Sequence, residues 1–261
     1  LNNVVIYGDL MRDMNNWDHI SLDNSDNRHI EFRSGYLTPG TRGTWQRKHL
    51  HYTPGTVFTD HFRYSREIPN PDIGFFHMTT PDEHNTSGFG TGLWDNKINI
   101  QKCKLVVAEV QENMLRTAGD NFIDTNLIDY FVIIPDGESP TAPARPERIP
   151  ANLEAIDVAA AITASLVNDG DTLEIGVGLA SNAVTPHLFD KKNLGYHSEL
   201  TSPGIADLYA VGVINGSNKS RDIGKMCVTL LPAQPEDIEI VARNYADWEV
   251  YGIDYIHNPS V

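Results

Sequence analysis

The chain has 261 residues, 40% of them hydrophobic and 21% charged, and its formal net charge at pH 7 is −15. These values are typical of a globular protein with one large or two modest α/β domains, and no apolar run is long enough to cross a membrane. The acidic balance argues against a nucleic-acid-binding protein, and two cysteines suit a reducing compartment, so we expect a cytoplasmic protein with no nucleic-acid or membrane partner.

The first half of the chain contains four short apolar runs that predict β-strands. They lie at 4–7, 73–78, 105–110 and 130–134. Continuous apolar runs suit parallel strands that are buried on both faces. We therefore expect an α/β fold with open, mostly parallel sheets and helices on both faces.

A proline-rich segment follows, with the sequence PDGESPTAPARPERIP at 135–150. Five prolines in sixteen residues exclude a helix or a central strand, which predicts an extended linker. The linker separates an N-terminal α/β domain at 1–134 from a second α/β region at 151–261.

The second region begins as a helix and continues as a βαβ unit. Residues 151–167 have helical spacing and an alanine-rich composition. A strand at 171–175, a helix through 190 and a strand at 194–199 follow. Parallel strands bring their C-terminal ends to one edge, where open α/β sheets bind ligands. Glu199 stands at that edge.

The residue types leave three interpretations of Glu199 open. It is a solvated acid at the end of a strand, or the ribose-binding acid of a dinucleotide fold, or a carboxylate nucleophile. The second interpretation rests on Gly176 and Gly178, which open a helix about 20 residues earlier. Ser181 stands where the third glycine of that fingerprint belongs, which weakens it.

Two other features have both a functional and a structural explanation. The free N–H groups of the turn at Gly176 and Gly178 could hold a phosphate or an oxyanion, but glycine also serves any tight turn. Arg116 could clamp a substrate carboxylate, or could form a structural ion pair with Asp120 or Asp124.

Candidate acid–base and metal-binding residues are weaker. The polar turn at 79–84 carries acid–base groups, but its proline and polar residues are typical of an ordinary turn. His49, His51 and His61 have strand-like spacing, but no cysteine or carboxylate completes a ligand set. We therefore expect no metal site.

Three segments together resemble the acetyl-CoA hydrolase/transferase family, which includes 4-hydroxybutyrate, butyrate and acetate CoA-transferases. The segments are PDIGFFHMTTPDEH at 71–84, RTAGD at 116–120 and LGYHSELTSPG at 194–204. Their order and spacing fit the family over essentially the whole chain. The resemblance implies a CoA-transferase-like fold whose second domain is incomplete.

The resemblance also implies a mechanism. The nucleophilic glutamate of the family falls on Glu199, which would carry CoA as a glutamyl thioester in a ping-pong transfer between an acyl-CoA and a free carboxylate. An acyl-CoA hydrolase would use the same intermediate and is the alternative. The CoA thioester is a substrate in both cases, and no tightly bound cofactor is expected.

The remaining positions are assigned by the same resemblance. CoA and the oxyanion would contact the glycines of two loops, namely Gly176, Gly178 and Gly204. The substrate would contact Pro81, Gly90, Arg116 and His197.

The chain departs from the family in three ways. Ser181 replaces a proline that is usual there, and 201–203 differ in the loop after the nucleophile. Family members also continue past the counterpart of 254–259 with a Gly-Gly-x-x-Asp-Phe segment that contributes to the CoA and oxyanion site. We therefore expect a homo-oligomer, or a hetero-oligomer with a chain that supplies this part. A fragment, or a non-catalytic and partner-dependent subunit, is the other alternative.

Overall fold

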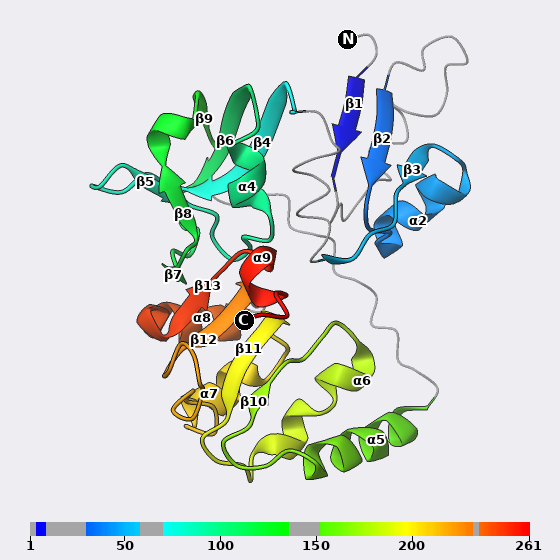
Figure 1. Ribbon diagram of the computed structural model, residues 1–261, viewed down its shortest axis with the longest axis vertical. Helices are drawn as coiled ribbons and strands as arrows, with labels where there is room; N and C mark the ends of the chain where they lie inside the picture. The colour runs from blue at the N-terminus through cyan, green and yellow to red at the C-terminus, as the bar shows by residue number, and fades with distance from the viewer. Residues whose placement is uncertain (1–3, 9–29, 58–69, 136–151, 232–234) are drawn as a thin grey trace. The chain divides into compact units, whose positions relative to one another are not determined.

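The structure is a computed structural model that describes residues 4–8, 30–57, 70–135, 152–231 and 235–261. Contacts divide the chain into two compact units (Figure 1). The first comprises 1–62 and 140–146, and the second comprises 63–139 and 147–261. None of the helices in the described ranges is both long and apolar enough to span a bilayer.

The first unit contains a parallel sheet in the order β1-β2-β3. Its described elements are β1 (Val4–Tyr7), β2 (Ile30–Ser34), α2 (Pro39–Gln46) and β3 (Leu50–Tyr52). Phe32 and Leu50 are paired in register and form its small buried core. The strand predicted at 4–7 is confirmed.

The second unit contains a three-stranded parallel sheet in the order β4-β6-β9, covered on one face by α4. The elements are β4 (Ile73–Thr79), α4 (Asn96–Ile100), β6 (Leu105–Gln111) and β9 (Tyr130–Ile133). The three predicted strands are confirmed. The expectation that both faces are buried is wrong, because β4 alternates between buried and exposed residues and all four residues of β9 are exposed.

A short antiparallel pair extends this region. It joins β5 (Thr86–Gly88) to β8 (Phe122–Asp124), and a 3-10 turn at Thr125–Leu127 follows.

The second sheet of this unit has five parallel strands in the order β10-β11-β12-β13-β7. They are β10 (Thr172–Leu173), β11 (Gly195–Leu200), β12 (Met226–Leu230), β13 (Trp248–Val250) and β7 (Ala118–Gly119). Strand β7 precedes the proline-rich segment, so this sheet draws on both predicted domains. Residues 136–150 of the predicted linker lie outside the described residues, and the boundaries at 1–134 and 151–261 stay a prediction.

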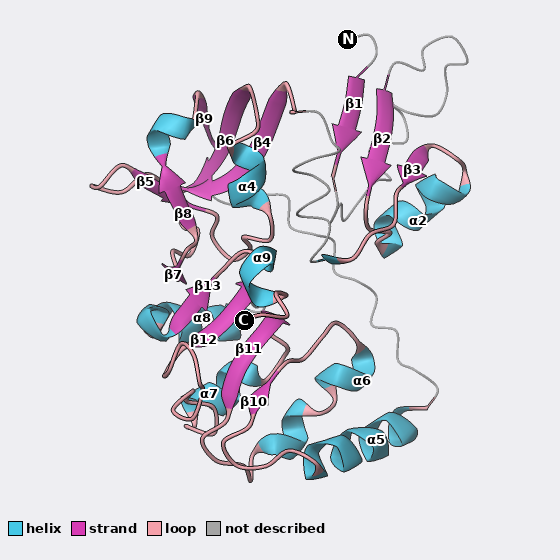
Figure 2. Ribbon diagram, viewed as in Figure 1, coloured by secondary structure: helices cyan, strands magenta, loops and turns pink. Residues whose placement is uncertain are grey.

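Helices lie on both faces of the five-stranded sheet (Figure 2). The register Tyr196–Met226–Trp248 places three fully buried side chains on one face, where Tyr209 packs edge-on against Trp248 at 5.5 Å. Tyr209 belongs to α7 (Ile205–Ala210), whereas α9 (Ile253–Ile256) contacts β11 and β12 from the other face. The expected α/β fold with helices on both faces is confirmed.

The other described helices show where the predicted elements end. They are α5 (Leu153–Ser165), α6 (Leu179–Asn182) and α8 (Pro235–Arg243), with 3-10 turns at Thr185–Leu188 and Tyr245–Asp247. The predicted helix at 151–167 is confirmed as α5. The prediction of a single helix through 190 is wrong. Pro186 lacks an N–H group, and its ring blocks continuation of α6.

Candidate active site

Glu199 is the next-to-last residue of β11, at the C-terminal edge of the five-stranded sheet. Alternate residues of a strand point to opposite faces. Tyr196 and Ser198 are therefore buried on one side, and His197 and Glu199 face the side that α9 occupies. The Glu199 side chain is 21% exposed, so it is neither freely solvated nor sealed in the core.

His257 is the side chain that holds the Glu199 carboxylate. Its Nε2 atom lies 3.3 Å from Oε2 of Glu199, and because an ionised carboxylate only accepts hydrogen bonds, the imidazole donates. The imidazole also lies edge-on to the Trp94 ring at 6.2 Å, and its Nδ1 atom is buried with no hydrogen-bond partner among the described residues. One carboxylate oxygen of Glu199 is thus held by the imidazole, and Oε1 has no hydrogen bond to a side chain among the described residues.

The glycine turn lies beside β11 because Ser198 holds it there. The Ser198 hydroxyl accepts from the N–H of Ile175 and donates to the carbonyl of Ile175, both at 3.1 Å. A side-chain carbon added at Gly176 would meet no atom within 4 Å. Gly178 caps α6, and its carbonyl accepts from the N–H of Asn182. Gly176 therefore borders open space beside the strand that carries Glu199.

The loop after Glu199 is fixed by Tyr196. The Tyr196 hydroxyl donates to the Leu200 carbonyl at 2.6 Å and accepts from the N–H of Ser202. Burial raises the pKa of Tyr196 to about 12, so the phenol stays neutral and can donate this bond. Gly204 has φ +82°, and a side-chain carbon there would lie 2.9 Å from Thr185, so packing alone requires a glycine.

The segment after β5 reaches the same edge. Gly92 bridges to Leu230, and the N–H groups of Leu93 and Trp94 donate to the carbonyl and hydroxyl of Thr229. Trp94 is thereby placed against His257. The predicted residue Gly90 lies just before this segment, which therefore joins the C-terminal end of β12.

Arg116 is engaged by the turn that carries Pro81. Its Nη2 lies 2.7 Å from Oδ2 of Asp82, and its Nη1 donates to the carbonyl of Thr80 at 2.9 Å. Hydrogen bonds from Thr86, together with the Arg116 charge, hold the pKa of Asp82 down at about 2. The structural ion pair is therefore real, but its partner is Asp82.

The two acids named as alternative partners of Arg116 have other contacts. Asp120 pairs with Lys97, and Asp124 accepts from the N–H of Asn126. Pro81 is exposed beside the Arg116–Asp82 pair, where its contact with a substrate stays a prediction.

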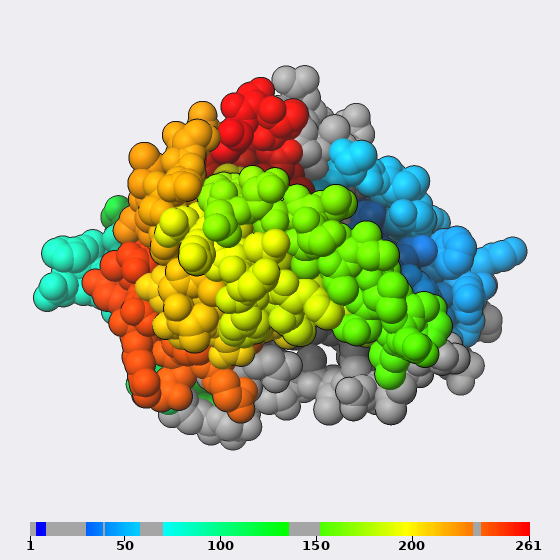
Figure 3. Space-filling view, turned by 90° about the horizontal axis from the view of Figure 1, so that it is seen from below, coloured from blue at the N-terminus to red at the C-terminus, as the bar shows by residue number. Residues whose placement is uncertain are grey.

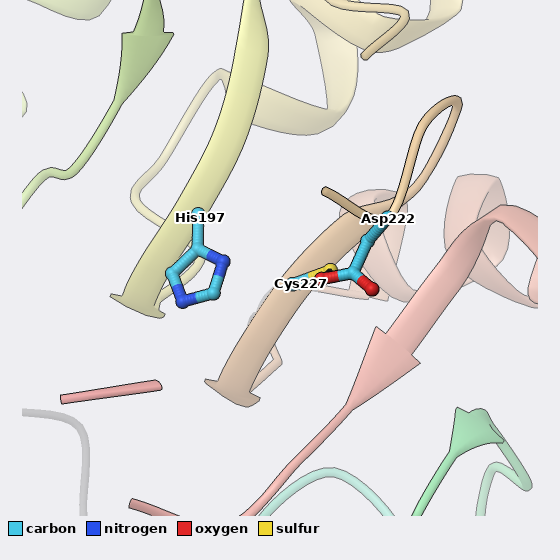
Figure 4. A group of neighbouring side chains, drawn as sticks. All are labelled: His197, Asp222 and Cys227. Atoms are coloured by element: carbon cyan, nitrogen blue, oxygen red, sulfur yellow. Dashed lines mark hydrogen bonds between the residues drawn. The ribbon is translucent and has the colours of Figure 1, made fainter. Parts of the chain in front are cut away.

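His197 belongs to a second cluster on the α9 face. One potential ligand atom each from His197, Asp222 and Cys227 lies within 4.8 Å of the others, and the side chains converge from β11, β12 and the preceding loop (Figure 4). Desolvation and the nearby Lys219 charge lower the pKa of His197, which favours the neutral ring. Of the three histidines first considered as metal ligands, His51 lies 3.9 Å from Glu31 and His61 is outside the described residues.

No protein-family model matches the chain, but curated proteins do. The 4-hydroxybutyrate coenzyme A transferase of Clostridium kluyveri is 33% identical over 237 residues, which are 90% of this chain and 53% of that protein. The probable butyrate:acetyl-CoA coenzyme A-transferase of Syntrophomonas wolfei is 25% identical over 257 residues, 95% of this chain and 55% of that protein. The chain spans about half the length of these relatives.

Solved structures share the fold. The 4-hydroxybutyrate CoA-transferase of Porphyromonas gingivalis has a TM-score of 0.72 and 25% identity, with 89% of this chain and 58% of that chain covered. RipA from Yersinia pestis has a TM-score of 0.75 and 26% identity, with 89% and 54% covered.

Proposed function

Because this chain is a homologue of the CoA-transferases, we propose that it carries the nucleophile of an enzyme that moves CoA between an acyl-CoA and a free carboxylate. The observation that carries the proposal is the geometry of Glu199. This carboxylate stands at the ligand-binding edge of a parallel sheet, with one oxygen held by His257 and the other without a side-chain hydrogen bond among the described residues. Neither a solvated acid nor a ribose-binding acid requires such a support.

The proposed reaction begins with attack of Glu199 Oε1 on the thioester carbonyl carbon. The C–S bond breaks, CoA leaves as a thiolate and a mixed anhydride remains on Glu199. The thiolate then attacks the glutamyl carbonyl and releases the original acyl group as a carboxylate. A second carboxylate reverses these steps and leaves as the new acyl-CoA.

Two features of the chain support this chemistry. The hydrogen bond from His257 orients the carboxylate, and attack by a positioned nucleophile requires no search through rotamers. The open space at Gly176 lets backbone N–H groups approach a developing oxyanion, where each well-placed donor contributes about 3 kcal/mol. Gly178 belongs to the same turn.

The site needs a further part of the enzyme in this proposal. The chain spans about half of its relatives. Helix α5, coloured green in Figure 3, lies at the surface and carries exposed apolar side chains. The exposed ones are Leu153, Val158 and Ile162, and Leu166 at the C-terminal cap is exposed as well. Strand β10 is also an unpaired edge of the sheet among the described residues. Such surfaces are typical of interfaces, so we place the completing part, from the same or another chain, over α5 and β10.

The test is to trap the thioester. The full chain, together with any part that completes it, is incubated with an acyl-CoA and reduced with borohydride, and its peptides are mapped by mass. We expect the modification on Glu199 and its loss in Glu199→Gln. Glu249→Gln removes a carboxylate from the same face of the sheet and serves as the matched control that keeps the label. Turnover without any label on Glu199 would overturn the assignment.

The dependence of turnover on a carboxylate acceptor distinguishes a transferase from a hydrolase. If the enzyme is a transferase, the original acyl-CoA is consumed in step with the added acetate, and a new acyl-CoA appears. Release of free CoA at the same rate with and without acetate identifies a hydrolase.

A further inference from the structure

The cluster of His197, Asp222 and Cys227 is a candidate metal site, and of its members only His197 is also predicted to contact the substrate of the transfer reaction. The strand register places His197 directly beside Cys227, so both side chains project from neighbouring strands to the α9 face. Asp222 reaches the same point from the loop before β12, as Figure 4 shows. The spacing of these three residues in the sequence does not predict a metal site, because they come together only through the pairing of β11 with β12.

Each of the three side chains has a partner outside the group, and within the group the Cys227 thiol donates to Oδ2 of Asp222 at 3.5 Å. The Tyr255 hydroxyl donates to Oδ2 of Asp222 at 2.8 Å, and Nζ of Lys219 donates to the sulfur of Cys227 at 3.3 Å. The His197 ring interacts with the backbone of Ile256, and its centre lies 5.9 Å from that of the Tyr255 ring. Metal ligands typically have such outer partners, which fix the ring orientation and the direction of each lone pair.

The cluster contains a cation that could compete with a metal, namely the buried ammonium of Lys219. Its three protons are taken by the carbonyls of Tyr196 and Lys225 and by the sulfur of Cys227. No ion pair joins Asp222 to a cation within the part of the chain that the structure describes. The charge of Arg221 also acts on His197, but neither cation forms an ion pair with Asp222 among the described residues.

We propose that His197, Asp222 and Cys227 bind one thiophilic divalent cation of the zinc class, with a fourth position open to water. Zinc binds imidazole nitrogen, carboxylate oxygen and thiolate sulfur at about 2.0–2.3 Å, so tetrahedral ligand atoms lie about 3.3–3.8 Å apart. The observed atoms, within 4.8 Å of one another, reach this spacing by a contraction of about 1 Å. On binding, the Cys227 thiol releases its proton to solvent, and thiolate and carboxylate together neutralise the cation. This proposal does not depend on the transferase function.

The test uses Co²⁺ as a spectroscopic substitute for Zn²⁺. The full chain is freed of metal with a chelator, and circular dichroism checks that it is still folded. Co²⁺ is then titrated while absorbance is recorded. We expect one equivalent to bind with a thiolate-to-cobalt charge-transfer band, and Zn²⁺ to abolish the band by displacement. A Cys103→Ser variant, which removes the other free thiol, should behave as the wild type.

The ligand variants decide the outcome. Cys227→Ser should lose the charge-transfer band, and Asp222→Asn, which keeps an acceptor for Tyr255, should weaken binding at least about tenfold. Asp222→Asn also covers the case in which Cys227→Ser fails to fold. The absence of a band in the wild type, its survival in Cys227→Ser, or unchanged affinity in Asp222→Asn would each overturn the proposal.

Discussion

His257 gives the Glu199 carboxylate its one side-chain contact among the hydrogen bonds of the described residues. The two side chains are equally exposed, at 21%, so neither is locked in place by burial alone. The orientation of the carboxylate therefore depends on the imidazole and on Trp94 behind it. This makes His257 a positioning residue in the proposed reaction.

The first prediction separates positioning from packing. His257→Leu removes the donor and should lower kcat about 100-fold with little change in the KM for acyl-CoA, because misplacement of a reacting group costs about that much. His257→Gln retains a nitrogen donor near the position of Nε2 and should recover most of the activity. Steady-state kinetics of the complete enzyme measure both values. Equal losses in the two variants would contradict the positioning role.

The second prediction concerns Asp82, whose pKa lies near 2 instead of the ordinary 3.8. A folded-state pKa below the unfolded value stabilises the protein above pH 4, and this stabilisation is lost as the pH falls towards 2. Asp82→Asn should therefore be less stable than the wild type at pH 6, and the difference should shrink between pH 4 and pH 2. Denaturant unfolding at several pH values measures it.

The matched control for Asp82 is Asp72→Asn. Asp72 forms an exposed ion pair with Lys104, and such pairs contribute little to stability. A pH-dependent difference of the same size in both variants would show that general charge, and not the turn around Arg116, is responsible.

At the scale of elements, strand β7 consists of Ala118 and Gly119 alone, yet it completes the five-stranded sheet. Gly119 has φ +88°, and a side-chain carbon there would lie 2.6 Å from the Val250 carbonyl oxygen. The pairing with β13 therefore requires both the left-handed backbone and the absence of a side chain.

The third prediction follows from that close approach. Gly119→Ala should lower the free energy of unfolding by about 2–4 kcal/mol, the sum of backbone strain and overpacking. Gly212→Ala is the matched control, because Gly212 has φ +82° but no atom within 4 Å of the added carbon. It should cost about 1–2 kcal/mol, from backbone strain alone. Equal costs in denaturant unfolding would exclude the contact with Val250 as the cause.

The same elements show how far the sequence predicts the structure. Strands with long apolar runs, such as β4 and β6, follow from local pattern. Strand β7 cannot be predicted in this way, because two residues are too few to show a hydrophobic period. It is a strand only because it pairs with β13. Likewise, the position of Glu199 at a strand end follows from the βαβ pattern. Its partner His257 lies 58 residues further along the chain and is brought near by tertiary packing.

At the scale of the whole molecule, the family resemblance read from three motifs is confirmed by curated relatives that are CoA-transferases. The roles assigned to individual site residues stay predictions. So does the need for a completing part, which rests on the partial coverage of those relatives and on the apolar surface of α5.

The fourth prediction tests that surface. Ile162→Glu lies on an exposed position of α5 and should change the stability of the chain by no more than about 0.5 kcal/mol. It should nevertheless weaken self-association or association with the completing part, as measured by analytical ultracentrifugation. Thr163→Glu, at the adjacent exposed polar position, is the control. Association that is unaffected by Ile162→Glu would exclude α5 from the interface.

The closure of the five-stranded sheet by β7 has a consequence for how the polypeptide folds. Strand β7 must wait for β13, which comes much later in the sequence, before this edge is paired. Contacts of such long sequence separation slow folding and leave intermediates with open strand edges. During synthesis β7 therefore stays unpaired until β13 has left the ribosome, and a peptide cut at the proline-rich segment would present the bare edge of β13 to aggregation.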